Sequence, residues 1–278
     1  IKYKYLIISM NKKLEKYIKV IYSFFCKSYQ IFSTFIENIC FRKKPTSNPI
    51  KNLGYFKYEK SDIDLSYLKN IERQKINNYL YVKSLSINQI NELIQSIFDA
   101  NFRRYITSLT GFEYSIDYMI IYDRTNIKEE DRNVSTLKRA YSYVWHFDKP
   151  NSSNMLKIII PLNISKANGP MKVIDKFSSS SNKLYAPVIE NNKTGVFTGF
   201  GNEIYGFNPT LCIHKDGIPS GNNIASQIMF QLNPYFEWSI NKNISKRMPQ
   251  LRNKIVWNSE PKFPLFAYRN DKRIPIVN

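Results

Sequence analysis

The stretch "MLKIIIPLNISKANGPMKVI", Met155–Ile174, contains two short apolar runs separated by a polar turn. The runs are Leu156–Leu162 and Met171–Ile174, and the residues between them include Asn, Ser, Gly and Pro. Short apolar runs bounded by such residues are typical of β-strands. Because no helical pattern separates the runs, the stretch predicts two strands joined without a crossover helix.

Similar strand-like runs occur on both sides of this stretch. They are Tyr114–Tyr122, Ala140–Trp145, Val196–Phe200, Thr210–Ile213 and Ile224–Leu232. Before them, Ser86–Gly111 has apolar residues at helical spacing, begins at a capping serine and ends at a glycine, which predicts one helix. A helix followed by many strands without alternation favours a mainly β (α+β) fold, an antiparallel barrel or two-sheet jelly roll with helical supports. A parallel dinucleotide-binding sheet is disfavoured because no glycine-rich phosphate loop is present.

Charge divides the chain of 278 residues into three parts. The net charge is +19, of which residues 1–60 carry +10 and residues 242–278 carry +7, leaving +2 for the middle. We therefore expect a basic, helical N-terminal segment and linker at 1–53. A single domain should follow at 54–278, with its core at about 114–234 and a basic tail.

The N-terminal segment has two alternative uses. Residues 12–41 show apolar residues at helical spacing, and residues 42–52 are typical of a linker. Lys27 and Glu37 interrupt the apolar pattern, so the helix fails as a membrane span. It could lie in a membrane interface, or dock through its apolar face on the domain or on a partner helix.

Localisation and partners follow from composition. Three cysteines without regular spacing indicate no disulfide framework, which favours a cytoplasmic setting, with peripheral membrane association as the alternative. Basic ends attract polyanions, although lysines also serve as a solvated surface. Nucleic acid is disfavoured as a partner because the lysines are not interleaved with aromatic residues in a recognisable binding module.

Both histidines of the chain, His146 and His214, fall at the ends of predicted strands. Within "YVWHFD", Tyr143–Asp148, His146 stands two residues before Asp148, so both side chains can point to one side of an extended segment. Two imidazoles and a carboxylate are the ligands of non-haem iron, and they leave positions open for reactants. The same ligands could bind zinc, and Asp148 could instead cap a turn before Pro150.

At these residues the chain resembles the phytanoyl-CoA dioxygenase-like family of Fe(II)- and 2-oxoglutarate-dependent oxygenases. Four pieces match in order: "YVWHFD", "MLKIIIPLNISKANGPMKVI", "CIHKDGIPSGN" and "QIMFQLNP". The resemblance covers roughly Tyr114 to Pro234. The resemblance implies a double-stranded β-helix, with His146, Asp148 and His214 as iron ligands. It also implies Fe(II) as the metal, with 2-oxoglutarate and O₂ as cosubstrates.

The sequence departs from the family at the residue that holds 2-oxoglutarate. The family places an arginine on the last core strand, where this chain has Gln227 if Gln231 aligns with the family's glutamine. Lys157, inside an apolar strand, is a candidate replacement, because an unpaired ammonium facing the core would be costly. We therefore expect Lys157, aided by Gln227, to bind the cosubstrate; alternatively, Lys157 lies on the outer face of an edge strand and extends to water.

The resemblance implies an oxidoreductase that hydroxylates or otherwise oxidises an unidentified small-molecule, lipid or sugar-type substrate and releases succinate and CO₂. Asp123–Arg139 and Ser178–Leu184 are the expected substrate-facing loops. Two alternatives stay open. One is a catalytically inactive β-helix module that attaches to a membrane or partner through its N-terminus. The other is a nucleic-acid oxygenase.

Overall fold

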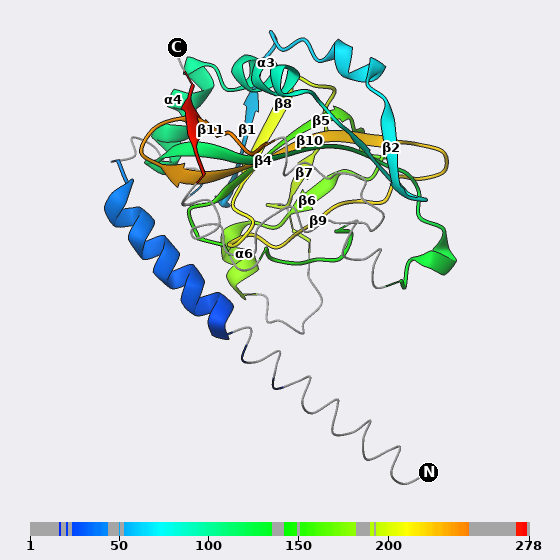
Figure 1. The fold of residues 1–278 in the computed structure, drawn as a ribbon. Helices are drawn as coiled ribbons and strands as arrows, with labels where there is room; N and C mark the ends of the chain where they lie inside the picture. Colours follow the sequence, from blue (N-terminus) through cyan, green and yellow to red (C-terminus); the bar gives the residue numbers. More distant parts are fainter. Residues whose placement is uncertain are drawn as a thin grey trace, which may run out of the picture.

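The computed structural model describes residues 17, 21, 24–43, 50, 53–134, 142–148, 151–181, 190–191, 193–244 and 271–276. In this part of the chain, a larger and a smaller β-sheet are packed together, and helices α3 and α4 lie over the larger sheet (Figure 1).

The larger sheet runs in the order β1 (Tyr55–Glu59), β8 (Glu203–Phe207), β5 (Leu156–Asn163), β10 (Ala225–Tyr235), β4 (Glu113–Arg124), β11 (Ser239–Asn241) and β12 (Arg273–Pro275). It also includes β3 (Leu80–Lys83), which pairs with β4, and β2 (Arg73–Asn77), which pairs with β3. The smaller sheet consists of β7 (Gly195–Phe197), β6 (Met171–Val173) and β9 (His214–Lys215). Short helices are η1 (Ser66–Asn70), η2 (Glu129–Asp131) and α6 (Lys176–Ser181).

The path of the chain between the sheets defines the fold. After β4 in the larger sheet, His146 pairs with His214 at the edge of the smaller one. The chain then forms β5, β6, β7, β8, β9 and β10 in turn. The resulting spatial order is β4-β10-β5-β8 in the larger sheet and His146-β9-β6-β7 in the smaller one. Two antiparallel sheets connected in this way form a double-stranded β-helix, or jelly roll. The fold class expected from the sequence is therefore confirmed.

The central strands of the larger sheet are buried on both faces. On one face, residues such as Ile158 and Phe230 pack with the helix residues Ile94 and Phe102. On the other face, Ile159 and Met229 pack in a second cluster with residues of the smaller sheet. Successive side chains of a strand point to opposite faces, so Lys157, two residues before Ile159, also faces the space between the sheets.

Two helices form where the sequence predicts one. α3 (Ile87–Ile97) begins at Ser86, which forms a capping box with Gln89, and α4 (Ala100–Thr110) ends at Gly111 with a φ of 78°. Between them Asp99 caps α4 by accepting a hydrogen bond from the backbone N–H of Phe102. The prediction of an unbroken helix was wrong because the apolar spacing continues across this second cap.

Several strand predictions differ from the structure. Residues 142–145 of the expected strand Ala140–Trp145 are not strand, and 140–141 lie outside the described residues. The expected strand Thr210–Ile213 is a turn, in which the Asn208 side chain accepts hydrogen bonds from the backbone of Thr210 and Leu211. Conversely, the sequence did not predict β1, β2, β3, β8, β9, β11 and β12, because strand pairing rather than local apolar pattern determines them.

The expected substrate-facing loops also need correction. Asp123 and Arg124 belong to β4, so the expected loop Asp123–Arg139 begins later, and its residues 135–139 lie outside the described part. Ser178 lies in α6, whereas 182–184 are not described.

Residues 24–40 form a helix that lies beside the rest of the described chain (Figure 1) and contacts residues 152–154. Gln30 donates a hydrogen bond to Ser153, and Thr34 accepts one from the Ser153 backbone at 2.8 Å. Glu37 accepts hydrogen bonds from the side chains of Ser152 and Asn154. Docking through the apolar face was one of the two uses considered for this segment, but the contacts of the helix with residues 152–154 are polar. Most of the linker 42–52 and of the tail 242–278 lies outside the described residues.

Candidate metal centre

The fold brings together His146, Asp148 and His214. The backbones of His146 and His214 exchange two hydrogen bonds of 3.0 Å each, and the N–H of Asp148 donates to the carbonyl of Pro209 at 2.9 Å. One potential ligand atom from each of the three side chains lies within 4.8 Å of the others. Residues 66 positions apart in sequence thus converge because the chain returns to the smaller sheet between them.

The spacing of the three side chains suits a single ion. Asp148 Oδ1 lies 3.5 Å from His146 Nε2 and 3.6 Å from His214 Nε2. Adjacent ligands of a first-row metal, with bonds of about 2.1 Å, are separated by about 3 Å. Both carboxylate–imidazole distances are therefore close to those between ligands of one ion, and all three ligand atoms lie within 4.8 Å of one another. An octahedral ion held by these three atoms would keep three open positions.

Backbone carbonyls fix the orientation of both imidazoles. Nδ1 of His146 lies 2.8 Å from the carbonyl oxygen of Val144, and Nδ1 of His214 lies 3.0 Å from that of Cys212. A carbonyl oxygen can only accept, so each Nδ1 carries the proton in the neutral ring. Each Nε2 lone pair is thereby left available for a metal, which is the usual arrangement of a metal-binding histidine.

Lys157 completes the site from β5. Its Nζ lies 2.5 Å from Oδ2 of Asp148, and the lysine is buried, so it does not lie on an outer face. Burial disfavours the charge on Asp148, but Lys157 and both imidazoles outweigh this effect and hold the pKa of Asp148 well below its ordinary value. The carboxylate is therefore ionised and ready to bind a cation.

The two histidines have opposite pKa shifts. Burial lowers the pKa of His214, and the neighbouring His146 lowers it further. Burial acts on His146 in the same direction, but the hydrogen bond and charge of Asp148 outweigh it and raise the pKa of His146. At least one imidazole is thus neutral and able to coordinate near pH 7.

Gln231 is a site residue to which the sequence reasoning assigned no role. It lies opposite Lys157 in the pairing of β10 with β5, so both side chains share the inner face. Gln231 is fully buried, and neither its amide nitrogen nor its amide oxygen has a hydrogen-bond partner among the described residues. A buried amide without a partner is costly, which suggests that a ligand completes its hydrogen bonds.

Gln227 lies four residues from Gln231 along β10, in a different polar cluster. Its amide donates to the hydroxyl of Tyr122 and accepts a hydrogen bond of 3.0 Å from Arg124. Arg124 also lies 3.4 Å from Asp216, which directly follows β9 and its ligand His214. Lys157 and Gln227 are therefore not brought together.

Arg124 is the second residue that sequence reasoning missed. It was placed in a loop, yet it ends β4 and is fully buried. Its guanidinium reaches Gln227 from the neighbouring strand, at the position where the resemblance led us to expect an arginine on β10. An arginine two residues after the apolar run Tyr114–Tyr122 was the available signal, because a buried arginine needs a partner or a ligand.

Two glycines hold the loops beside this cluster in close contact. Gly169 has a φ of 66°, and a Cβ there would lie 2.5 Å from the backbone of Ile218. A Cβ on Gly217 would lie 2.5 Å from the backbone of Gly169, and the carbonyl of Gly217 accepts a hydrogen bond of 2.8 Å from Arg124. The sequence pieces "MLKIIIPLNISKANGPMKVI" and "CIHKDGIPSGN" therefore contact each other through Gly169 and Gly217.

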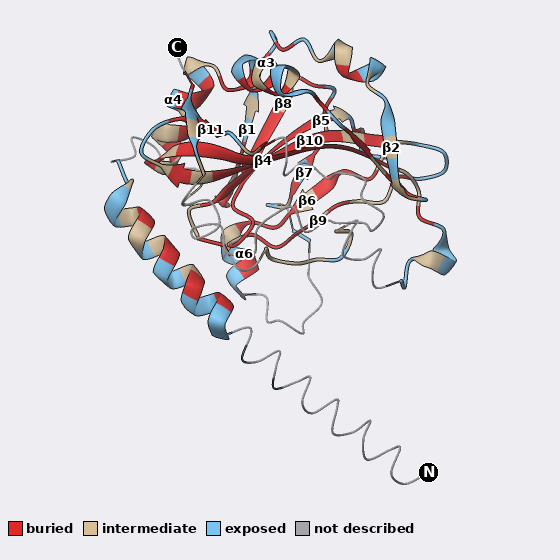
Figure 2. Cartoon of the chain, in the orientation of Figure 1, coloured by how far each residue is buried: buried red, intermediate tan, exposed pale blue. Residues whose placement is uncertain are grey.

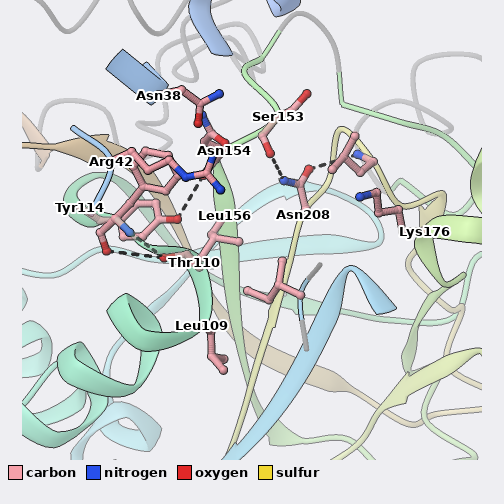
Figure 3. A pocket seen from close by; sticks show the side chains of 13 residues that line it. Asn38, Arg42, Leu109, Thr110, Tyr114, Ser153, Asn154, Leu156, Lys176 and Asn208 are labelled. Carbon is pink, nitrogen blue, oxygen red and sulfur yellow. Dashed lines mark hydrogen bonds between the residues drawn. The ribbon is translucent and has the colours of Figure 1, made fainter. Parts of the chain in front are cut away.

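Two cavities lie elsewhere in the molecule. One, of about 240 Å³, lies between the end of the N-terminal helix and the domain and is lined by residues that include Asn38, Arg42, Tyr114, Lys176 and Asn208 (Figure 3). The other, of about 580 Å³, is lined by residues that include Lys69, Lys83 and Phe200. Neither is lined by the His146, Asp148 and His214 side chains.

Searches against models of known families and against curated proteins find no match. Among solved structures, HygX from Streptomyces hygroscopicus, crystallised with nickel, 2-oxoglutarate and hygromycin B, is similar at 10% identity and a TM-score of 0.44, over 68% of this chain and 86% of its own. An oxidoreductase of the 2OG-Fe(II) oxygenase family from Burkholderia pseudomallei has 11% identity and a TM-score of 0.45, over 68% and 88%. EctD from S. alaskensis has 13% identity and a TM-score of 0.45, over 70% and 83%.

Proposed function

We propose that this protein is an Fe(II)- and 2-oxoglutarate-dependent oxygenase that oxidises a small-molecule, lipid or sugar-type substrate. The observation that carries the proposal is the arrangement of His146, Asp148 and His214, whose three ligand atoms lie within 4.8 Å of one another. Two histidines and one carboxylate on one face of an ion are the ligand set of non-haem iron oxygenases. The sequence resemblance to the phytanoyl-CoA dioxygenase-like family is consistent with this ligand set, and membership of that family is part of the proposal.

The protein residues would hold the metal in an open, oriented site. The carbonyls of Val144 and Cys212 fix the histidine rings, and Lys157 holds one oxygen of Asp148 so that the other faces both imidazoles. Bound iron would supply the oxidising chemistry with O₂ as the oxidant and 2-oxoglutarate as the cosubstrate that is converted to succinate and CO₂. The buried inner face of the sheets, including Phe207 beside His214, would keep water away from the reaction.

Two described cationic groups flank the metal ligands and could bind the carboxylates of the cosubstrate. Lys157 lies beside Asp148, and Arg124 lies beside Gln227 and Asp216. Arg124 offers a planar guanidinium, which recognises a carboxylate through two parallel hydrogen bonds. We therefore add Arg124 to Lys157 and Gln227 as a candidate anchor of 2-oxoglutarate, and Gln231 as a candidate hydrogen-bond donor.

The proposal is tested by anaerobic titration with Fe(II) and 2-oxoglutarate. We expect the weak visible charge-transfer band of an iron-bound keto acid, and we expect His146→Ala to abolish it while circular dichroism shows a folded protein. A folded wild-type protein that binds Fe(II) but shows no band with 2-oxoglutarate would contradict the cosubstrate assignment.

Succinate release separates the enzyme from the alternative of an inactive binding module. An oxygenase of this class releases some succinate even without its proper substrate, so wild type should exceed the His146→Ala variant. The inactive module would be favoured if wild type binds the metal but neither wild type nor His146→Ala releases succinate with any of a panel of small molecules.

A further inference from the structure

The N-terminal helix has a buried face that is fixed to the domain. Cys26, Tyr29, Ser33 and Glu37 are buried, at successive spacings of three and four residues. Such a spacing places them on one side of a helix. Gln30 donates a hydrogen bond to residues 152–154, and Thr34 and Glu37 accept hydrogen bonds from them. These bonds fix this side of the helix against the domain, so the fold also sets which way the opposite side faces.

The opposite face of the same helix is exposed (Figure 2), and large apolar residues lie on it. At 100° per residue, its large apolar residues occupy an arc of about 120°. Within residues 24–40 they are Phe24 (70% exposed), Phe25 (61%), Ile31 (63%), Phe32 (49%), Phe35 (60%) and Ile39 (65%), and before them come the helical residues Tyr17 (66%) and Ile21 (56%). We call these residues the aromatic stripe.

The aromatic stripe is unusual for a surface. It contains eight of the sixteen large hydrophobic residues that are exposed in the described part of the chain. Apolar side chains scattered singly over a surface are ordinary, but a contiguous stripe marks an interaction site. A helix that only supports the fold would turn this face inward, whereas here the polar face is turned inward.

The net charge of the sequence segment that contains the aromatic stripe indicates what the stripe contacts. Residues 12–44 include eight Lys or Arg and two Glu, a net charge of +6, and one of the two acids, Glu37, is buried. Two copies of this segment would repel each other, which disfavours self-association. An anionic lipid surface attracts such a segment and accepts the apolar side chains at the boundary of head groups and acyl chains.

We propose that the aromatic stripe binds the protein peripherally to an anionic membrane. The helix would lie in the plane of the interface with Phe24, Phe35 and their neighbours inserted, while its docked face holds the domain beside the membrane. No helix among the described residues is long and apolar enough to cross a membrane.

The test is co-sedimentation of the full chain with vesicles. Vesicles of phosphatidylcholine are compared with vesicles in which about a third of the lipid is phosphatidylserine. The variant Phe24→Ser/Phe35→Ser changes two exposed residues of the stripe. Phe177→Ser/Phe200→Ser is the matched control, because these phenylalanines are 62% and 70% exposed on other parts of the surface.

We expect wild type and control to bind the anionic vesicles at least about tenfold more strongly than the stripe variant does. We also expect wild type and control to bind anionic vesicles more strongly than they bind neutral vesicles. Equal binding by the stripe variant and the control would overturn the proposal, as would no binding by wild type. Sedimentation velocity without lipid tests the alternative that a second copy of the chain covers the aromatic stripe. A wild-type dimer that the stripe variant abolishes would assign the face to a second copy and overturn the membrane proposal.

Discussion

Lys157 Nζ lies 2.5 Å from Oδ2 of Asp148, the carboxylate that also faces both histidines of the candidate metal centre. Both residues are largely buried, and the positive charge balances the carboxylate in the absence of another cation. A bound metal ion would also balance part of the negative charge of Asp148. The pair therefore links the stability of the fold to occupancy of the site.

Replacing Lys157 with Met should destabilise the metal-free protein by about 3 to 5 kcal/mol, because the buried carboxylate loses its partner. A bound divalent ion would restore the missing positive charge. We therefore expect Co(II) to raise the melting temperature of Lys157→Met more than that of wild type. Differential scanning calorimetry with and without Co(II) measures the loss of stability and the metal-induced rise in melting temperature. A smaller metal-induced rise in the variant would show that Lys157 is needed to form the ligand set.

Arg124 and Lys157 can be compared as anchors of 2-oxoglutarate. Arg124→Lys keeps the positive charge but loses the two parallel hydrogen bonds of a guanidinium, which together contribute about 1.5 to 3 kcal/mol. If Arg124 binds the cosubstrate, the KM for 2-oxoglutarate should rise by about ten- to a hundredfold, whereas kcat should change little. Succinate release against 2-oxoglutarate concentration measures this. An unchanged KM in Arg124→Lys, with a raised KM in Lys157→Arg, would assign the anchor to Lys157.

Gly217→Ala should disturb the contact between two loops near Arg124. The added Cβ would lie 2.5 Å from the backbone of Gly169, so the loops must separate. We expect a loss of about 1 to 3 kcal/mol in the free energy of unfolding, as for other overpacked positions. Urea denaturation measures it. Gly221→Ala is the control for backbone strain, because Gly221 has a φ of 56° but a Cβ there meets nothing within 4 Å. Gly217 itself has no positive φ, so its loss should come from the contact alone. An unchanged free energy of unfolding in Gly217→Ala would contradict this.

Glu37 should make docking of the N-terminal helix depend on pH. Burial raises the pKa of Glu37 from 4.5 to about 7, although Ser152 and Asn154 oppose the shift. Because the folded state holds the proton more tightly, the stabilisation is complete below about pH 4.5 and is lost as pH rises to about 7. It amounts to at most about 3 kcal/mol between these limits. Melting temperatures from pH 5 to 8 should fall more in wild type than in Glu37→Gln, which cannot ionise. Parallel profiles would contradict the assignment.

Some features of the protein follow from the sequence alone. The runs in Tyr114–Tyr122 and Leu156–Leu162 correspond to β4 and β5, because long β-branched and aromatic runs specify strands wherever they pack. The scarcity of histidine pointed to His146 and His214, and the i, i+2 spacing pointed to Asp148. Ser86 and Gly111 marked helix ends through local capping, which requires no distant residue.

Tertiary structure decided the rest, because these features depend on residues that meet only after the sheets pair. The register of β10 with β5 places Gln231, and not Gln227, opposite Lys157, and a shift of one residue would turn every such side chain to the other face. The pairing of β10 with β4 brings Arg124 to Gln227. The N-terminal helix has a periodic apolar face in the sequence, but only its polar contacts with Ser152–Asn154 decide that this face is exposed.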